Sequence, residues 1–251
     1  MARRDSARAP AADTAGAVAQ RLADELVRQG GPLRERAAGG LRDLGALDQA
    51  VYSAIAATPT PALDEPLRRL SNAANNSGLW LATAAGLAVA GGSAGRRAAV
   101  RGTAAIGVTS ALVNLVVKAA WSRPRPDRAS IGVPVRRNVR MPTSTSFPSG
   151  HAASGFAFAA AIGRDQPWLG MVLRFLSATV AYSRVHTGVH YPGDAVVGAL
   201  IGEGIGETVA GLMDRRAPAR RPSRSRRDKQ AELPDAAESA ALADQHGSET
   251  G

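Results

Sequence analysis

The chain has 251 residues, a formal net charge of +10, no cysteine and only 4% aromatic residues. The absence of cysteine excludes disulfide bonds and thiolate metal sites, zinc fingers included. The mean hydropathy of -0.11 would suit a soluble protein, but it averages two polar ends with an apolar centre, 77–213, that is typical of a membrane protein. We therefore expect one membrane domain with two tails.

Two polar segments precede the apolar centre. Residues 1–44, rich in Ala, Arg, Asp and Glu, predict a flexible region, with an amphipathic helix possible over 15–29. They contain no apolar run like that of a secretory signal peptide, so we expect internal helices to direct membrane insertion. Residues 45–76 contain two helical patterns separated by 58–61, and the alternation of Leu with charged residues in the second predicts helices on the membrane surface.

Five apolar stretches follow and each predicts a transmembrane helix; they cover 77–92, 102–120, 150–163, 167–184 and 193–213. A hydrocarbon core of ~30 Å needs about 20 helical residues, so the first, third and fourth stretches need polar ends within the interface. The fold class expected is an all-α integral-membrane bundle of about five transmembrane helices, preceded by interfacial helices. A helical bundle in water is the alternative.

Arginine residues indicate the orientation of this bundle. They occur between the first and second helices, between the third and fourth, and in a run over 215–229, three places that share one side by parity. The positive-inside rule makes that side cytoplasmic, so the connections 121–149 and 185–192 are expected to be extracytoplasmic. The tail, 214–251, is expected to be disordered and cytoplasmic, with its basic run bound to acidic lipid headgroups rather than to nucleic acid.

The first polar motif lies at the end of the second apolar stretch, where Lys118 precedes Arg125 and Pro126. Only two of the 31 basic residues are Lys, so an ammonium group here suggests a specific contact, although snorkelling of a helix-end Lys would also explain it. Ser110, Asn114 and Lys118 recur at a spacing of four, and this polar stripe is expected to face the bundle interior.

The second motif, Ser149-Gly150-His151, opens the third apolar stretch. A helix start offers unpaired backbone N–H groups, the positive end of the helix dipole and here a hydroxyl, all of which favour an anion such as phosphate. Alternatively, Ser149 is only an N-cap and His151 an ordinary residue of the first turn.

The third motif joins the fourth and fifth stretches and contains Arg184, His190 and Asp194. His190 and Asp194 are four residues apart, so on one helix face the carboxylate could hold one ring nitrogen and leave the other as a nucleophile. A surface histidine beside a helix-start acid is the alternative. Together, however, the three motifs place cations, a helix start and two histidines on one membrane side, which is what phosphoryl transfer requires.

At these residues the chain resembles the type 2 phosphatidic acid phosphatase superfamily, which shares its site with vanadium-dependent haloperoxidases. The resemblance covers about 77–213. It implies that His190 becomes a phosphohistidine, that Asp194 supports it, and that His151 protonates the leaving group. It also implies no metal and no cofactor, and a phosphate site made by Lys118, Arg125, Ser149, Gly150 and Arg184.

The resemblance further implies a membrane-embedded lipid phosphate as substrate. It is strongest to short bacterial members that act on polyprenyl carriers, such as undecaprenyl diphosphate phosphatases and decaprenylphosphoryl-phosphoribose phosphatases. Phosphatidic acid or phosphatidylglycerol phosphate stays open, because the motifs specify the phosphate and not the lipid. A non-catalytic membrane-anchored protein with a basic binding tail is the alternative from another class. The oligomeric state stays open as well.

Charged residues outside the three motifs are expected to be peripheral. We interpret Arg123, Arg136, Arg137 and Arg140 as solvated loop charges, in preference to an extension of the site toward a second phosphate or a sugar phosphate. His186 is interpreted as a residue of the pocket rim.

Two features are expected inside the membrane. Arg174 and Glu203 each lie about 14 Å below the catalytic level at ~1.5 Å per helical residue, so we expect them to pair, with Glu207 as a second candidate partner. A stripe of Gly198, Gly202 and Gly206 predicts close helix contact, within the bundle in preference to between protomers.

Overall fold

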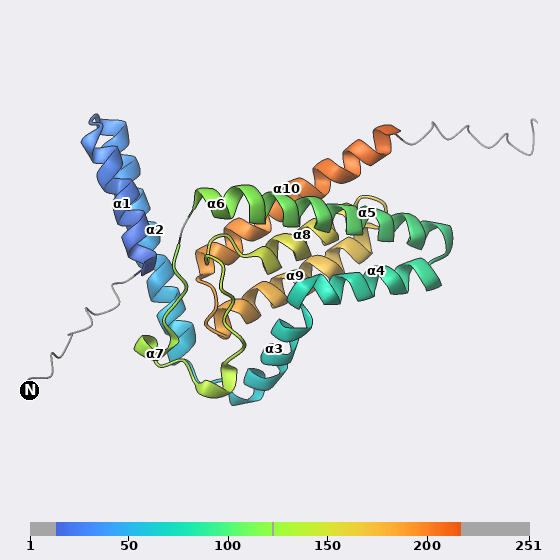
Figure 1. Cartoon of the computed structure of the whole chain (residues 1–251), viewed down its shortest axis with the longest axis horizontal. Helices are drawn as coiled ribbons and strands as arrows, with labels where there is room; N and C mark the ends of the chain where they lie inside the picture. Colours follow the sequence, from blue (N-terminus) through green and yellow to red (C-terminus); the bar gives the residue numbers. More distant parts are fainter. Residues whose placement is uncertain (1–13, 122, 217–251) are drawn as a thin grey trace, which may run out of the picture. The chain divides into compact units, whose positions relative to one another are not determined.

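A computed structural model describes residues 14–121 and 123–216, and no β-strand occurs among them. The first two helices, α1 (Thr14–Arg28) and α2 (Pro32–Ala57), pack against each other as a hairpin (Figure 1). Gly30 and Gly31 make the turn with φ of 70° and 101°, values that a residue without a Cβ adopts readily. Residues 14–44 are thus helical, where the sequence suggested a mainly flexible segment.

A short amphipathic helix connects the hairpin to the bundle. Helix α3 (Pro61–Ala73) begins after the Thr-Pro segment and buries Asp64, Leu67 and Ser71 on the face that packs on helix α9 (Pro167–His186). The single turn η1 (Asn75–Ser77) then redirects the chain, with Asn76 and Ser77 at φ of 53° and 58°.

The five apolar stretches form helices, as predicted. They are α4 (Gly78–Ala90), α5 (Gly92–Ala111) with its extension, α8 (Gly150–Gly163), α9 and α10 (Pro192–Arg216). The extension is a π-helical segment, η2 (Leu112–Val117), followed by α6 (Lys118–Ala120). Helix α8 is central, because ten of its fourteen residues are buried and α5 and α9 pack on it (Figure 1).

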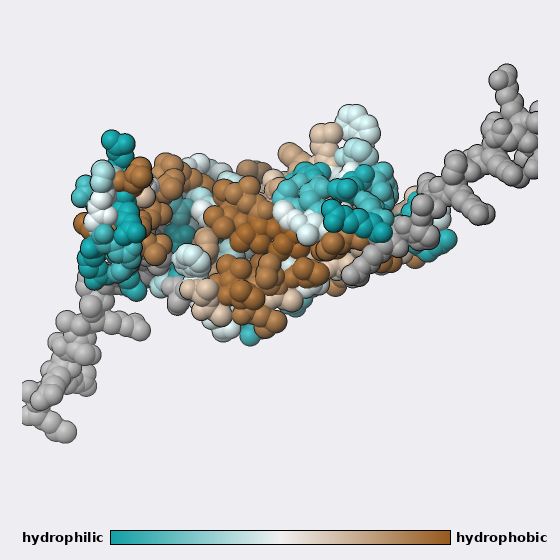
Figure 2. Space-filling view, turned by 90° about the horizontal axis from the view of Figure 1, so that it is seen from above, coloured by the Kyte–Doolittle hydropathy of each residue, from teal (hydrophilic) through white to brown (hydrophobic). Residues whose placement is uncertain are grey.

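Two of these helices, Gly92–Ala120 and Pro192–Arg215, are long and apolar enough by length and composition to cross a membrane. The outer surface is apolar as well, since large hydrophobic side chains such as Leu115, Phe175 and Leu200 are each more than two-thirds exposed. Figure 2 shows a broad hydrophobic area on one face, with hydrophilic surface beside it. An exposed apolar surface of this kind fits a lipid environment.

Helix α10 lies directly on α8 through its glycine stripe. A Cβ atom on Gly198, Gly202 or Gly206 would lie 2.5, 2.1 or 2.4 Å from a backbone carbonyl oxygen of α8 or of its N-cap. Only glycine permits this approach, so the predicted packing within the bundle is confirmed. The contact also brings the start of α10 to the N-terminus of α8, where the Ser149 N–H donates to the Asp194 carbonyl at 2.9 Å.

Ion pairs lie at the other end of the bundle. Arg174 Nε donates to Glu203 Oε1 at 2.9 Å and Arg174 Nη2 lies 3.7 Å from Glu207 Oε1, which confirms the predicted pair and its second partner. Arg101 and Arg164 both contact Asp214, near the end of α10. These contacts fix α5, α9 and α10 relative to one another.

Candidate active site

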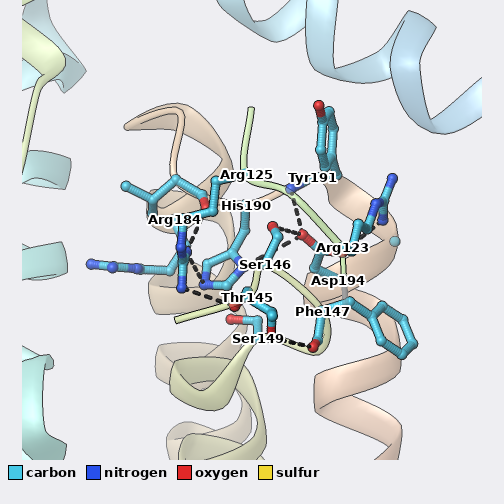
Figure 3. Close-up of polar contacts among 12 residues, drawn as sticks. Arg123, Arg125, Thr145, Ser146, Phe147, Ser149, Arg184, His190, Tyr191 and Asp194 are labelled. Atoms are coloured by element: carbon cyan, nitrogen blue, oxygen red, sulfur yellow. Dashed lines mark hydrogen bonds and ion pairs between the residues drawn. The ribbon is translucent and has the colours of Figure 1, made fainter. Parts of the chain in front are cut away.

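The polar motifs meet at one end of the bundle, where the 121–149 connection crosses the N-terminus of α8 and the turn between α9 and α10 (Figures 1 and 3). His190 lies in that turn and Asp194 in the first turn of α10. Both are almost fully buried, with side-chain exposures of 2% and 0%, and His190 Nδ1 lies 3.4 Å from Asp194 Oδ2. The structure therefore rejects the alternative of a surface histidine beside a helix start.

Asp194 is held by several donors at once. Its Oδ1 accepts from Arg123 Nη1 at 2.6 Å, while its Oδ2 accepts from the backbone N–H of Tyr191 at 3.0 Å and from the hydroxyl of Ser146. The Arg123 guanidinium also stacks 4.3 Å from the centre of the Tyr191 ring. A carboxylate with this many partners is fixed in place and stays ionised. It can therefore orient the imidazole of His190.

The protonation of His190 follows from its neighbours. Arg125 Nη1 lies 3.2 Å from His190 Nε2, and a guanidinium can only donate, so Nε2 carries a lone pair and Nδ1 carries the proton that faces Asp194. Burial lowers the pKa of His190 to about 4, with Arg125 and Arg184 acting in the same direction and Asp194 in the opposite one. The imidazole is thus neutral near pH 7, with Nε2 available as a nucleophile.

Arg125 and Arg184 lie beside His190 without a carboxylate partner among the described residues (Figure 3). Arg125 donates to the carbonyls of Ser144 and Val189 at 2.9 and 2.7 Å, and Arg184 Nη1 donates to Ser71 Oγ at 2.6 Å. Arg184 is 1% exposed, and its Nε has no hydrogen-bond partner within the described protein. Cations without a counter-ion, one fully buried and one partly buried, favour an anionic ligand.

Lys118 adds a third cation of this kind. Its Nζ contacts only Ser144 Oγ, at 3.3 Å, among the described residues. A Cβ on Gly150 would lie 4.0 Å from this Nζ, so the ammonium group faces the start of α8. The half-buried cation thus lies at the helix start that the sequence suggested for an anion.

The sequence offered two interpretations of the N-terminus of α8, an anion-binding helix start and an ordinary N-cap, and the structure has features of both. Ser149 is the N-cap, since its Oγ accepts from the Ala152 N–H at 3.4 Å, and it is fully buried within the site. His151 Nε2 lies 3.0 Å from Asn75 Oδ1. Lys118, Gly150 and His151 together line a pocket of about 230 Å³. The stripe residues Ser110 and Asn114 line it as well, although Asn114 is exposed and not buried in the bundle interior.

Two interpretations of peripheral charges, those of Arg137 and His186, were wrong. Arg137 is fully buried and donates to Asp64 at 2.7 Å. Arg136 contacts the same carboxylate, but its side chain is 56% exposed, as expected for a loop charge. His186 is not at a pocket rim, because it is 1% exposed with Nε2 3.0 Å from Asp64 Oδ1. The counter-ion comes from α3, more than 70 residues away, so the loop sequence alone could not reveal it. Arg140 is exposed, as expected.

Arg123 was also misread as a solvated loop charge. It is buried between Asp194 and Asp48, whose Oδ2 accepts from Arg123 Nη2 at 2.6 Å. Asp48 Oδ1 additionally accepts from the Gly193 N–H at 2.6 Å. Sequence reasoning missed Asp48, Ser146 and Asn75, because none belongs to a motif and Asp48 lies on α2, in a segment treated as interfacial.

No group of three or more His, Asp or Glu side chains is placed to hold a metal ion within 14–121 and 123–216. Three cations without a carboxylate partner among the described residues lie at the site: Lys118, Arg125 and Arg184.

The architecture and site define a helical membrane protein with a cluster of cations beside a buried histidine at one end of its bundle. Residues 99–217 match the family model of the PAP2 superfamily. The chain is 35% identical over 134 residues to decaprenylphosphoryl-5-phosphoribose phosphatase of Mycolicibacterium smegmatis, covering 52% of this chain and 68% of that protein. The chain therefore belongs to the PAP2 superfamily, as the motifs predicted.

Further relatives agree with this assignment. The Mycobacterium tuberculosis (strain H37Rv) protein of the same name is 37% identical over 110 residues, and the match spans 43% of this chain and 58% of the relative, less than two-thirds of its length. Among solved structures, a transmembrane PAP2 type phosphatidylglycerolphosphate phosphatase from Bacillus subtilis has a TM-score of 0.55 at 19% identity, covering 82% of this chain and 98% of that one. Aquifex aeolicus LpxE has a TM-score of 0.53 at 24% identity, covering 66% and 95%. These structures support the transmembrane helical fold.

Proposed function

We propose that this protein is a membrane lipid phosphatase that acts without a metal ion and forms a phosphohistidine. The observation that carries the proposal is the group of cations without carboxylate partners, Lys118, Arg125 and Arg184, gathered near the unprotonated Nε2 of His190. A phosphate bound to these cations would have its non-bridging oxygens neutralised. Its phosphorus atom could then lie in line with the imidazole lone pair.

The first step would transfer the phosphoryl group to the enzyme. His190 Nε2 forms a bond to phosphorus while the bond from phosphorus to the lipid-side oxygen breaks. Asp194 stabilises the positive charge that develops on the imidazole, because it faces the protonated Nδ1. His151, at the N-terminus of α8, donates a proton to the leaving oxygen.

The second step would return the free enzyme. Water attacks the phosphohistidine, His151 accepts the proton of that water, and inorganic phosphate leaves. Ser149 and Gly150 contribute to phosphate binding through the start of α8, which carries a partial positive charge.

A polyprenyl carrier is the proposed substrate class. Two of the relatives are named for decaprenylphosphoryl-5-phosphoribose, and a 58-residue match at 43% identity is to a putative undecaprenyl-diphosphatase of Escherichia coli. An extracytoplasmic site and a cytoplasmic C-terminus are proposed from the positive-inside rule. The proposed contact of the basic tail with acidic lipids involves the run over 215–229, of which 217–229 lie outside the described part of the chain.

Phosphate release by the detergent-purified chain tests this function. Polyprenyl phosphates, polyprenyl diphosphates, phosphatidic acid and phosphatidylglycerol phosphate are supplied in the presence of EDTA. We expect EDTA-resistant release that is fastest with a polyprenyl substrate and absent in a His190→Ala variant. Preference for a glycerolipid phosphate would replace the substrate class, and full activity of His190→Ala would reject the mechanism.

A further inference from the structure

A second and larger cavity lies between the N-terminal hairpin and the beginning of α10. Its volume is about 610 Å³, against about 230 Å³ for the pocket beside His151. Among the described residues, none that is proposed above to bind phosphate or to transfer a proton lines this larger cavity. We call it the hairpin groove; its lining residues lie within 19–22, 41–51 and 192–197 and at 121, 123 and 147.

The walls of the hairpin groove are mostly hydrocarbon. Its two charged side chains, Asp48 and Arg123, are paired with each other at 2.6 Å. A cavity with such walls offers few hydrogen bonds to a sugar, a nucleotide or a peptide backbone, so its ligand is itself apolar. Large apolar side chains that line the groove are between 38% and 63% exposed: Leu22, Leu44, Leu47, Val51, Trp121 and Val196.

The hairpin groove opens onto the outer surface of α10. Val196 lines the groove and is 58% exposed, and Leu200, on the same face of the helix one turn later, is 68% exposed. Helix α10 is long and apolar enough to cross a membrane. Trp121 directly follows the other such helix, Gly92–Ala120, and tryptophan is enriched where a membrane meets water. Bilayer lipid around these helices therefore has direct access to the groove.

Neither polar tail of this chain supplies an apolar ligand for the groove. Residues 1–13 and 217–251 contain only Met1, Leu233 and Leu242 as large apolar residues, and each stands alone among polar or small ones. Transfer of charged tail residues into a hydrocarbon-lined cavity would be costly. The ligand is therefore expected to come from outside these tails.

The groove also lies on the far side of Asp194 from the proposed phosphate. Arg123, which lines the groove, is on one side of Asp194, whereas Arg125 and Arg184 are on the other side, next to His190 (Figure 3). His190 Nδ1 faces Asp194, so Nε2 and a phosphate bonded to it point away from the groove. A hydrocarbon chain that starts at this phosphate does not lead into the groove.

We propose that the hairpin groove binds a hydrocarbon chain of a bilayer lipid that is not the substrate, and that this lipid holds α2 against α10. Asp48 lies on α2, and its carboxylate accepts hydrogen bonds from Arg123 and from the Gly193 N–H. A chain packed between the two helices makes dispersion contacts with both, so it favours the arrangement in which Asp48 reaches Arg123. Because Arg123 in turn holds Asp194, the bound lipid favours the active geometry of the site. The lipid site itself is independent of the proposed function, whereas its effect on catalysis rests on that function.

Photolabelling with a phosphatidylcholine that carries a diazirine in one acyl chain tests the lipid site. Full-length protein is reconstituted with this lipid, extracted, washed in detergent to remove loosely held lipid, illuminated and mapped by mass spectrometry. Wild type is compared with Leu47→Asn, which places an amide in the groove wall, and with Leu47→Trp, which fills the groove without adding a charge. Leu33→Asn is the matched control, because Leu33 lies on the same helix, is 79% exposed and does not line the groove. Thermal unfolding of each variant is measured alongside.

We expect labels within 41–51 and 192–197, and none around Phe175, an exposed residue of α9 that ordinary surface lipid would reach. Leu47→Asn should lower labelling of the groove about tenfold, because a polar amide in an apolar wall weakens binding. Leu47→Trp should lower it as well, and Leu33→Asn should leave it unchanged.

Three results would overturn the lipid site. Equal labelling around Phe175 would mean that only surface lipid is present. Displacement of the label by a prenyl phosphate, but not by unlabelled phosphatidylcholine, would assign the groove to the substrate chain. A wild-type dimer that Leu47→Asn dissociates would assign the groove to a second copy of this chain.

Hydrolysis of a water-soluble aryl phosphate tests the effect on catalysis, because this substrate has no hydrocarbon chain of its own. Phosphatidylcholine added to the detergent-purified protein should raise kcat about fivefold in wild type and in Leu33→Asn, but not in Leu47→Asn. An unchanged wild-type kcat at full labelling would reject the coupling through Asp48. If wild type hydrolyses neither the aryl phosphate nor a lipid phosphate, the proposed function fails, while the labelling still decides the lipid site.

Discussion

Asp48 and Arg123 form an ion pair, with Asp48 Oδ2 2.6 Å from Arg123 Nη2, that joins helix α2 to the carboxylate facing His190. Asp48 lies outside residues 99–217, the segment that matches the PAP2 family model. The N-terminal hairpin is thus connected to the site through a guanidinium held between two carboxylates. Asp48 also holds the start of α10, because its Oδ1 accepts a hydrogen bond from the Gly193 N–H.

Asp48→Asn should therefore affect catalysis from a distance. Breaking a buried ion pair costs about 3 kcal/mol, and Arg123 would then hold Asp194 less firmly. We expect kcat to fall about tenfold with KM little changed, together with a lower free energy of unfolding. Asp43→Asn, an exposed position on the same helix, is the control. Equal kinetics for the two variants would show that the hairpin does not position the site.

Substitution of His190 and substitution of His151 should give different results when the phosphoenzyme is trapped. His190→Ala should lower turnover at least ~1,000-fold and abolish acid-labile ³²P labelling of the protein, because the nucleophile is gone. With an aryl phosphate, whose leaving group needs little protonation, His151→Ala should still form the phosphoenzyme and hydrolyse it slowly. Labelled His151→Ala should therefore accumulate. If no labelled His151→Ala protein is found after rapid quenching, the result would argue against a phosphohistidine.

Stability should depend on His190 in mildly acidic solution. In the folded protein burial lowers its pKa to about 4, whereas in the unfolded chain it is near 6.5. Between these values the unfolded chain binds more protons, so stability is full above pH 6.5 and falls by about 3 kcal/mol as the pH drops towards 4. Denaturant unfolding in detergent should show this slope in wild type and a smaller one in His190→Gln. Identical slopes would mean that His190 is not buried in its neutral form.

The effects of replacing Arg174 and Glu203 on the free energy of unfolding should not be additive. Each side chain is about one-third exposed, at 33% and 34%, on a part of the bundle that the sequence predicts to lie in the membrane. Replacing either residue alone by Ala leaves an unpaired charge and should cost about 2 kcal/mol of unfolding free energy. The double Ala variant should cost less than the sum of the two. Additive losses would indicate that lipid or water, and not the partner, stabilises each charge.

Gly202 of the glycine stripe should not tolerate a side chain, whereas Gly204, which is outside the stripe, should tolerate one. Gly202→Val would bring its Cβ to 2.1 Å from the Ala153 carbonyl and push α10 away from α8, displacing Asp194 from Ser149. We expect lower thermal stability and more than a tenfold loss of activity. Gly204→Ala meets nothing within 4 Å and should be neutral or slightly stabilising, since Ala favours helix. Similar behaviour of both variants would contradict the packing.

Local patterns in the sequence were sufficient for the helices and the motif residues. The five apolar stretches, the stripe from Ser110 to Lys118 and the glycine spacing are periodic features, and periodicity determines which face of a helix is apolar or small. His190 and Asp194 come together as the sequence suggested, but not as two residues of one helix, because α10 begins at Pro192 and His190 lies in the turn before it.

Only the tertiary structure decided which charged groups are paired. Arg123 and Arg125 are two residues apart in the same loop, yet Arg123 is bound by two carboxylates and Arg125 by none among the described residues. His186 and His190 differ in the same way, since one faces Asp64 and the other Asp194. The acids that make these distinctions, Asp48 and Asp64, come from helices more than 70 residues upstream of the arginines that they pair with. Because pairing depends on distances of a few ångströms in the folded chain, no local pattern could separate a structural arginine from one left free to bind phosphate.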